Sequence, residues 1–175
     1  MTEHVARGEV ETPLGTLRIA ATERGVVRLA LPRESGRGFG AFLARAFADA
    51  EPVDWLPWID KASAQIAEYF AGKRTEFDVA IDLRGTPFQL RVWRALCEIP
   101  FGETVSYAEL ARTIRSPLAV RAVGAANGAN PVPLIVPCHR VIASDGGLGG
   151  YGGGLEAKRR LLAFERARLP RGALL

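Results

Sequence analysis

The sequence pattern of this chain changes near Arg84-Gly85, and this change limits the folds that the chain can adopt. Before this point, short alternating apolar runs are separated by turn residues, which indicates strands. After it, apolar residues recur at helical spacing behind helix-start signals. We therefore predict an α/β (α+β) fold with two domains, residues 1–84 and 85–175, of which the second is mostly helical.

The first half of the chain predicts a small α/β unit. Three short strands are joined by turns at Pro13-Leu14-Gly15 and Glu23-Arg24-Gly25, which favours an antiparallel meander. Two helices and a fourth strand follow. No residue of this half belongs to a recognisable catalytic motif. The expected strands and helices lie at residues 8–12, 16–22, 26–31, 39–48, 57–71 and 77–83.

Three helix-start signals organise the second half. Thr86-Pro87-Phe88-Gln89 and Ser106-Tyr107-Ala108-Glu109 have the form of a capping box, and Ser116-Pro117 combines a cap residue with a proline. We expect helices that run from these signals to about residues 98, 114 and 127. The last two are short and joined by a tight turn. This arrangement indicates a helix-turn-helix, although many helical hairpins share the pattern.

The third of these helices has an unusual outer face. Arg121, Gly124, Ala125 and Gly128 follow the i, i+3, i+4, i+7 spacing that places residues on one face. Such small residues let the helix backbone approach a partner closely, or pack tightly against a neighbouring helix. The arginine favours a polyanionic partner, as does the formal net charge of +4.

Cys138 lies in the segment Ile135-Val136-Pro137-Cys138-His139-Arg140-Val141-Ile142. The apolar start of this segment predicts a buried strand over residues 132–136 that ends at a thiol beside an imidazole and a guanidinium. A neighbouring histidine or arginine favours the thiolate, which is the nucleophilic form of cysteine. A buried structural cysteine is the alternative, and the Cys-His pair alone does not decide between the two.

A last helix is expected over residues 155–168. Glu165 falls on the same face as Leu161 and Leu162, which we expect to be buried, and a buried carboxylate needs a partner. His139 is the natural candidate. The preceding glycine-rich stretch surrounds Tyr151 and matches no phosphate-binding motif, so it indicates a loop whose backbone lies close to a ligand.

Composition argues against several classes of protein. Two cysteines, Cys97 and Cys138, provide no disulfide framework, and two histidines without a paired-cysteine motif argue against a zinc site. We expect Cys97 to serve packing. No apolar run is long enough to span a bilayer, and the N-terminus lacks a signal-peptide pattern. A cytoplasmic protein without a membrane partner is therefore expected.

The run Asn130-Pro131-Val132-Pro133-Leu134-Ile135-Val136-Pro137-Cys138-His139-Arg140-Val141-Ile142 resembles the active-site signature of the O6-alkylguanine-DNA alkyltransferases, also called methylated-DNA–protein-cysteine methyltransferases. The resemblance covers about residues 85–167, including Ser106-Tyr107, Arg121-Ala122-Val123-Gly124 and Tyr151-Gly152-Gly153-Gly154, whereas the first half matches only loosely. It implies a ribonuclease-H-like N-terminal domain and a winged-helix-like C-terminal domain. It also implies irreversible transfer of an alkyl group from guanine O6 in DNA to a cysteine, without a cofactor.

The resemblance also implies roles for individual residues. Cys138 would be the nucleophile, His139 its base through a water molecule, and Glu165 the group that orients His139. Arg121 would fill the gap that an extruded nucleotide leaves in the duplex, while Tyr107 would help rotate that nucleotide outward and donate a proton to its base. Further DNA contacts are implied for Ser106, Arg115, Gly124, Ala125 and Gly128, although the family often has glycine where Arg115 lies. Pocket positions are implied for Tyr151, Gly152, Gly153, Val141 and Asn130.

Three other functions fit parts of this pattern. A protein that binds alkylated DNA without repairing it would lack the cysteine, and a winged-helix regulator would not need Cys138, His139 and Glu165 together. A cysteine hydrolase would need an oxyanion hole, of which the sequence has no clear sign. The expected partner is thus double-stranded DNA that contains O6-alkylguanine, with O4-alkylthymine as a further candidate substrate. A monomer is expected to bind it, and no metal is expected.

Overall fold

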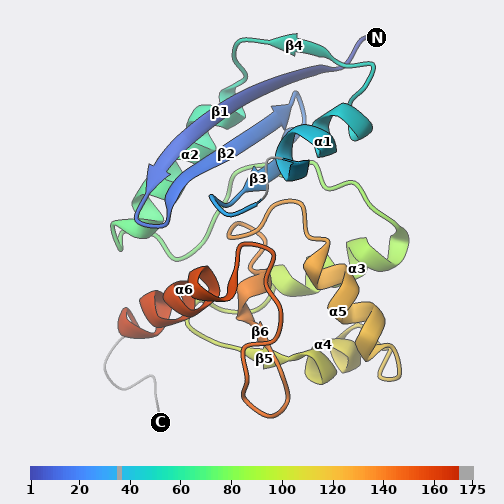
Figure 1. Cartoon of the computed structure of the whole chain (residues 1–175), viewed down its shortest axis with the longest axis vertical. Coiled ribbons are helices and arrows are strands. Elements are labelled where there is room, and N and C mark those ends of the chain that lie inside the picture. The colour runs from blue at the N-terminus through green and yellow to red at the C-terminus, as the bar shows by residue number, and fades with distance from the viewer. Residues whose placement is uncertain (35–36, 170–175) are drawn as a thin grey trace. The chain divides into compact units, whose positions relative to one another are not determined.

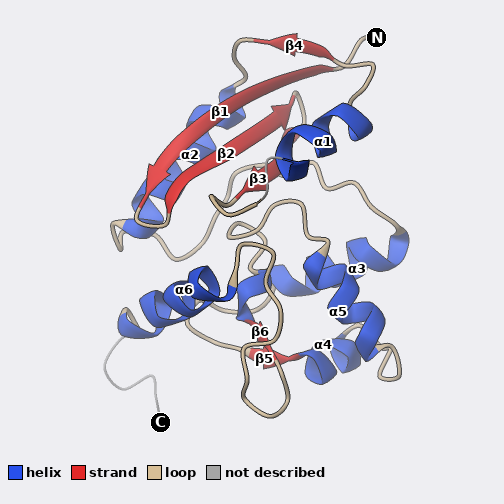
Figure 2. Ribbon diagram, viewed as in Figure 1, coloured by secondary structure: helices blue, strands red, loops and turns tan. Residues whose placement is uncertain are grey.

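The computed structural model describes residues 1–34 and 37–169, and the side chain of residue 37 lies outside this description. The chain forms two compact units, Met1–Arg84 and Gly85–Leu175. Figure 1 traces the chain and Figure 2 shows its helices and strands. A sheet with two helices forms the first unit, and helices dominate the second, so the predicted α/β organisation is confirmed.

Four strands form the sheet of the first unit in the order β3-β2-β1-β4. The first three strands pair antiparallel, which confirms the predicted meander, whereas β4 pairs parallel with β1. The sequence analysis did not predict β4, a strand of three residues. The strands are β1 (His4–Thr12), β2 (Gly15–Thr22), β3 (Gly25–Ala30) and β4 (Glu51–Val53).

The strand predicted over residues 77–83 is wrong. This segment makes only an isolated bridge between Ile81 and Val26. Its alternating pattern does bury Val79, but the backbone N–H groups of Asp78 and Val79 donate to Gln65 Oε1 at 3.1 and 3.3 Å. Because a side chain satisfies these two donors, backbone pairing with β3 is limited to two hydrogen bonds, from Val26 N to Ala80 O and from Asp82 N to Val26 O.

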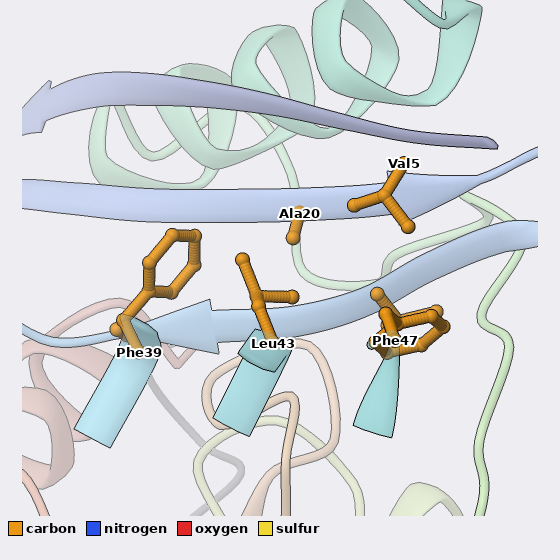
Figure 3. Close-up of a cluster of buried hydrophobic side chains, with 7 residues drawn as sticks. Val5, Ala20, Phe39, Leu43 and Phe47 are labelled. Atoms are coloured by element: carbon orange, nitrogen blue, oxygen red, sulfur yellow. The ribbon is translucent and has the colours of Figure 1, made fainter. Parts of the chain in front are cut away.

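Two helices cover opposite faces of this sheet, α1 (Arg37–Ala46) and α2 (Pro57–Phe70) (Figure 1). Figure 3 shows Phe39 and Leu43 of α1, with Phe47 just beyond it, directed at Ala20 and Val5 of the sheet. On the α2 side, a Cβ at Gly8 would lie only 2.4 Å from Ile59 Cγ2. A side chain at position 8 would therefore push α2 away from β1.

Three helices form the centre of the second unit, and α3 (Pro87–Cys97) and α4 (Tyr107–Thr113) both pack against α5 (Val120–Gly128). Trp93 on α3 is buried, and its Nε1 donates to Ala126 O at 2.8 Å, which joins α3 to α5. Thr86 and Ser106 cap α3 and α4 in complete capping boxes, as predicted. The elements are α3 (Pro87–Cys97), β5 (Val105–Ser106), α4 (Tyr107–Thr113), α5 (Val120–Gly128), the 3-10 turn η1 (Cys138–Arg140), β6 (Val141–Ile142) and α6 (Leu155–Ala167).

The predicted helix start at Ser116-Pro117 is wrong, because α5 begins at Val120. Arg115 has a φ of 58°, Arg115 N donates to Arg112 O and Ser116 N donates to Ala111 O. This is the Schellman arrangement that ends a helix, with arginine where glycine is most common. Ser116 therefore closes α4, and a further turn precedes α5.

Three smaller expectations also fail. Residues 132–136 are buried as expected but form a tight turn, in which Leu134 has a φ of 74° and Val136 N donates to Val132 O. A turn at this point cannot continue as a strand. Leu162 is only half-buried, although it was expected to be buried. Cys97 is exposed, so the prediction that it serves packing is wrong.

None of the helices in the described ranges is long and apolar enough to cross a membrane.

The packing of α1 on the sheet predicts a stability effect. Leu43 is 2% exposed, so Leu43→Ala should lower the free energy of unfolding by about 2–4 kcal/mol through lost burial and a cavity. Urea unfolding followed by circular dichroism measures this change. Arg45→Ala, at an exposed position of the same helix, should change it by less than about 0.5 kcal/mol. Equal effects of the two substitutions would contradict this packing.

Candidate functional site

Cys138 is the first residue of the 3-10 turn η1 and is 4% exposed. The chain reaches it through the buried turn at residues 132–136. Asn130 holds this turn from both sides, because its Nδ2 donates to Val136 O at 2.8 Å and its Oδ1 accepts from Val132 N at 3.0 Å. The position of the thiol therefore depends on a side chain that follows directly on α5.

A buried network of charged side chains lies next to the cysteine in sequence. Glu165 on α6 accepts from His139 Nε2 at 2.8 Å, the hydrogen bond that the sequence led us to expect. Arg140 Nε and Nη2 also donate to this carboxylate, at 3.0 and 2.9 Å, and Gly102 N donates to it at 3.1 Å. Arg140 Nη1 donates in turn to Ile99 O at 2.6 Å. The network joins η1, α6 and the segment after α3.

The pKa values of this network define the protonation states. Burial alone would raise the pKa of Glu165, but the hydrogen bonds and charges of His139 and Arg140 outweigh it and lower this pKa to about 2. Burial lowers the pKa of His139 and outweighs the opposing effect of Glu165. Glu165 is therefore an anion beside a neutral imidazole at neutral pH.

These states determine the tautomer of His139. Because Nε2 faces the Glu165 carboxylate, Nε2 carries the proton and Nδ1 carries a lone pair. Nδ1 is buried and has no hydrogen-bond partner within residues 1–34 and 37–169. An imidazole held in this state can accept a proton at Nδ1, and Glu165 then stabilises the resulting cation.

A pocket of about 530 Å³ opens over the outer face of α5. Arg121, Ala125 and Gly128 on this face are exposed, as the residue spacing indicated. The pocket combines apolar surface with one arginine and two tyrosines. Its lining residues are Tyr107, Val120, Arg121, Gly124, Asn127, Gly128, Gly150, Tyr151 and Gly152.

Two residues connect this pocket to Cys138. Asn127 lines the pocket and its Nδ2 donates to Cys138 O at 3.4 Å. Burial raises the pKa of Tyr107, and the charge of Cys138 raises it further, so the phenol keeps its proton near neutral pH. Gly149 has a φ of +68°, and a Cβ there would lie 2.8 Å from Tyr107 Oη. Only glycine lets the loop approach Tyr107 so closely.

Several expected site residues lie outside the pocket lining. Ser106 caps α4 through Glu109 N, and Arg115 is exposed at the end of that helix. Asn130 and Gly153 are both buried. Val141 is also buried, and its carbonyl accepts from Lys158 Nζ at 2.6 Å. The described residues contain no cluster of histidine, cysteine, aspartate and glutamate side chains that could hold a metal ion.

The sequence analysis missed two residues of this site, Asn127 and Lys158. Lys158 belongs to the run Lys158-Arg159-Arg160, whose charge is typical of a solvated helix face. The structure instead buries Lys158 completely. Helical spacing could have identified it, because Lys158 lies three residues before Leu161 and seven before Glu165, and all three share the buried face.

Comparisons with known proteins cover both units. Residues 5–83 match the family model described as 6-O-methylguanine DNA methyltransferase, ribonuclease-like domain. Residues 87–167 match the model described as 6-O-methylguanine DNA methyltransferase, DNA binding domain. Together these matches span both units of the chain.

Individual relatives agree with the family models. A methylated-DNA–protein-cysteine methyltransferase from Mycobacterium tuberculosis is 61% identical over 161 residues, which are 92% of each chain. One from Mycolicibacterium paratuberculosis is 47% identical over 164 residues, again 92% of each. The crystal structure of Mycobacterium tuberculosis OGT in complex with DNA has a TM-score of 0.79 and 44% identity, covering 95% of each chain. The chain therefore belongs to the 6-O-methylguanine DNA methyltransferase family.

Proposed function

We propose that this chain repairs DNA by transferring the alkyl group of O6-alkylguanine to the sulfur of its own Cys138. The observation that carries this proposal is the neutral His139, with Nε2 bound to Glu165 and a lone pair at Nδ1, next to the cysteine. A thiol needs such a base to become a nucleophile. The pocket over α5 provides a site for an extruded base, and the family relationship is consistent with both.

The proposed reaction proceeds in one displacement. The Cys138 thiol loses its proton to His139 Nδ1 through a water molecule, and Glu165 stabilises the imidazolium that forms. The thiolate attacks the alkyl carbon, so a carbon–sulfur bond forms while the carbon–O6 bond breaks. Guanine leaves with the electron pair of that bond and takes a proton from Tyr107. The carbon–sulfur bond of the thioether is not cleaved again, so the thiol is not regenerated and each chain reacts once.

DNA binding follows from the outer face of α5. Arg121 and the small residues Gly124, Ala125 and Gly128 let the helix backbone approach the minor groove closely, where the arginine fills the gap left by the extruded nucleotide. All proposed groups come from residues 107–165 of one chain, so a monomer is sufficient. We expect this monomer to act in the cytoplasm on double-stranded DNA.

The alternatives use less of this site. A protein that only binds alkylated DNA has no need of a cysteine beside a neutral imidazole. A winged-helix regulator would need α4 and α5 but not the buried Cys138, His139 and Glu165. Alkyl transfer uses the pocket, the exposed helix face and the buried network together.

The mass of the protein after reaction tests the proposal directly. Mixing with a duplex oligonucleotide that contains one O6-methylguanine should add one methyl group per chain, on the peptide that contains Cys138. Cys138→Ala should abolish the adduct but retain DNA binding. The exposed Cys97 provides the matched control, because Cys97→Ala should leave the adduct unchanged. A methyl group on Cys97, or turnover beyond one equivalent, would refute the assignment.

The role of Arg121 predicts a difference between two substrates. Arg121→Ala should slow repair of O6-methylguanine in duplex DNA by about tenfold or more, because base extrusion costs a few kcal/mol that the arginine offsets. Reaction with free O6-benzylguanine needs no extrusion and should change little. Single-turnover rates measure both. Arg94→Ala, at an exposed position of α3, is the control, and equal losses on both substrates would contradict the role.

The buried network predicts a loss of stability in acid. Below pH 6.5 the unfolded chain protonates His139 more readily than the folded chain, and between pH 4.5 and about 2 the same holds for Glu165. The unfolded state then binds more protons, so the free energy of unfolding falls as the pH falls. The contribution of Glu165 is on the order of 3 kcal/mol.

Urea unfolding at several pH values checks this prediction. Glu165→Gln should destabilise the protein at pH 7 by about 3 kcal/mol, because it leaves Arg140 buried without an anion, and should flatten the dependence below pH 4.5. Glu156→Gln, which changes an exposed carboxylate of the same helix, should do neither. An unchanged slope in Glu165→Gln would argue against the network as the source of acid sensitivity.

A further inference from the structure

We propose that Asn127 recognises the extruded base, with its side-chain oxygen Oδ1 accepting a hydrogen bond from the exocyclic amino group of O6-alkylguanine. The inference deepens the proposed function and rests on it. Asn127 lies in the last turn of α5, is 4% exposed and lines the pocket over that helix. A residue in this role determines which alkylated bases the pocket accepts.

The side chain of Asn127 is paired at one end only. Its Nδ2 donates to Cys138 O at 3.4 Å, whereas Oδ1 is buried and has no hydrogen-bond partner within residues 1–34 and 37–169. Leaving a buried amide oxygen without a donor costs free energy, so such oxygens are paired in most folded proteins. An unpaired oxygen on a residue of the pocket wall indicates a hydrogen-bond donor on the molecule that the pocket binds.

The neighbouring carbonyl determines which end of the amide is the oxygen. Cys138 O can only accept, so the amide atom that faces it has to be the donor Nδ2. With the amide reversed, two oxygen atoms would face each other and the nitrogen would lose its acceptor. The unpaired atom is therefore an acceptor, and its partner on the ligand has to be an N–H or O–H group.

Small residues leave space between Asn127 and the pocket. Gly124 lies three residues earlier on the same face of α5, and a Cβ there would meet only Tyr107 Cδ1, at 3.9 Å. A Cβ at Gly128 or Gly150 would have nothing within 4 Å. All three glycines line the pocket. Because the bond from Nδ2 to Cys138 O is long, turning the amide toward a bound base sacrifices little.

O6-alkylguanine has one group that can donate to this oxygen. Alkylation at O6 leaves N1 without a proton, and N9 is bonded to the sugar, so the amino group on C2 carries all the N–H bonds of the base. O4-alkylthymine has no N–H bond. A buried acceptor that stays unpaired disfavours the ligand that lacks the donor. Asn127 therefore selects O6-alkylguanine over O4-alkylthymine, the further candidate substrate.

Single-turnover kinetics with two duplexes test this recognition. One duplex contains O6-methylguanine and the other O6-methylhypoxanthine, which lacks only the amino group. The parent protein should react about tenfold faster with the first, because the second leaves Oδ1 unpaired. Asn127→Leu, which keeps the size of the side chain without its polar atoms, should lose most of this preference. Differences in stability between the two duplexes cancel when the ratio of rates is compared between proteins.

Val120→Ala is the matched control, because it changes an apolar residue of the same pocket and should leave the ratio of the two rates unchanged. A structural role of Asn127 would lower both rates of Asn127→Leu and keep the ratio of the parent protein, and this result would overturn the proposal. If the parent protein transferred no methyl group from O6-methylguanine, the proposed function itself would be contradicted, so the two failures are distinguishable.

A second measurement keeps Asn127 intact and covers the case in which Asn127→Leu does not fold. The chain has two asparagines, Asn127 and Asn130, so labelling asparagine with 13C gives two side-chain carbonyl signals. Asn130 is the internal reference, because both ends of its amide pair with backbone groups. In Cys138→Ala, which lacks the nucleophile, the signal of Asn127 should differ between the complexes with the two duplexes, and that of Asn130 should not. Identical Asn127 signals in both complexes would overturn the proposal.

Discussion

The buried carboxylate of Glu165 is the group on which the C-terminal unit depends most. It accepts hydrogen bonds from His139, Arg140 and Gly102, and Arg140 extends the network to Ile99. Removing any one partner would leave a buried charge or a buried donor unsatisfied, at a cost of several kcal/mol. The 3-10 turn, α6 and the segment after α3 must therefore come together in a single arrangement, and the position of Cys138 follows from it.

The same network also determines the electrostatics of the site. Arg140 pairs with the Glu165 carboxylate, and burial lowers the pKa of His139. The imidazole is therefore neutral and can accept a proton.

Irregular backbone contributes as much to the site as the helices do. Arg115 and Leu134 both have a left-handed backbone conformation. The first ends α4 before the turn that leads into α5, and the second lies in the turn that precedes Cys138. The second of these turns is held by the side chain of Asn130. Gly149 lets the loop approach Tyr107 closely, and Tyr107 lines the pocket.

By itself the sequence determined the two-part organisation, the meander, the capped starts of α3 and α4, the exposed face of α5 and the pairing of His139 with Glu165. The helix starts depend on contacts within a few residues, which Thr86 and Ser106 show directly. His139 and Glu165 are 26 residues apart, but helical spacing placed Glu165 on a buried face, where a carboxylate needs a partner. Only the tertiary structure decided the rest. In the segment at 77–83, Gln65 binds the donors of Asp78 and Val79, so pairing with β3 is limited to a single bridge at Val26. Ser116 closes one helix instead of opening the next. Lys158 belongs to a basic run that is typical of an exposed helix face, yet its side chain is buried and its Nζ donates to three backbone carbonyl groups outside α6. Residues that lie far apart along the chain leave no local pattern of their contacts, so the pocket became visible only in the folded molecule.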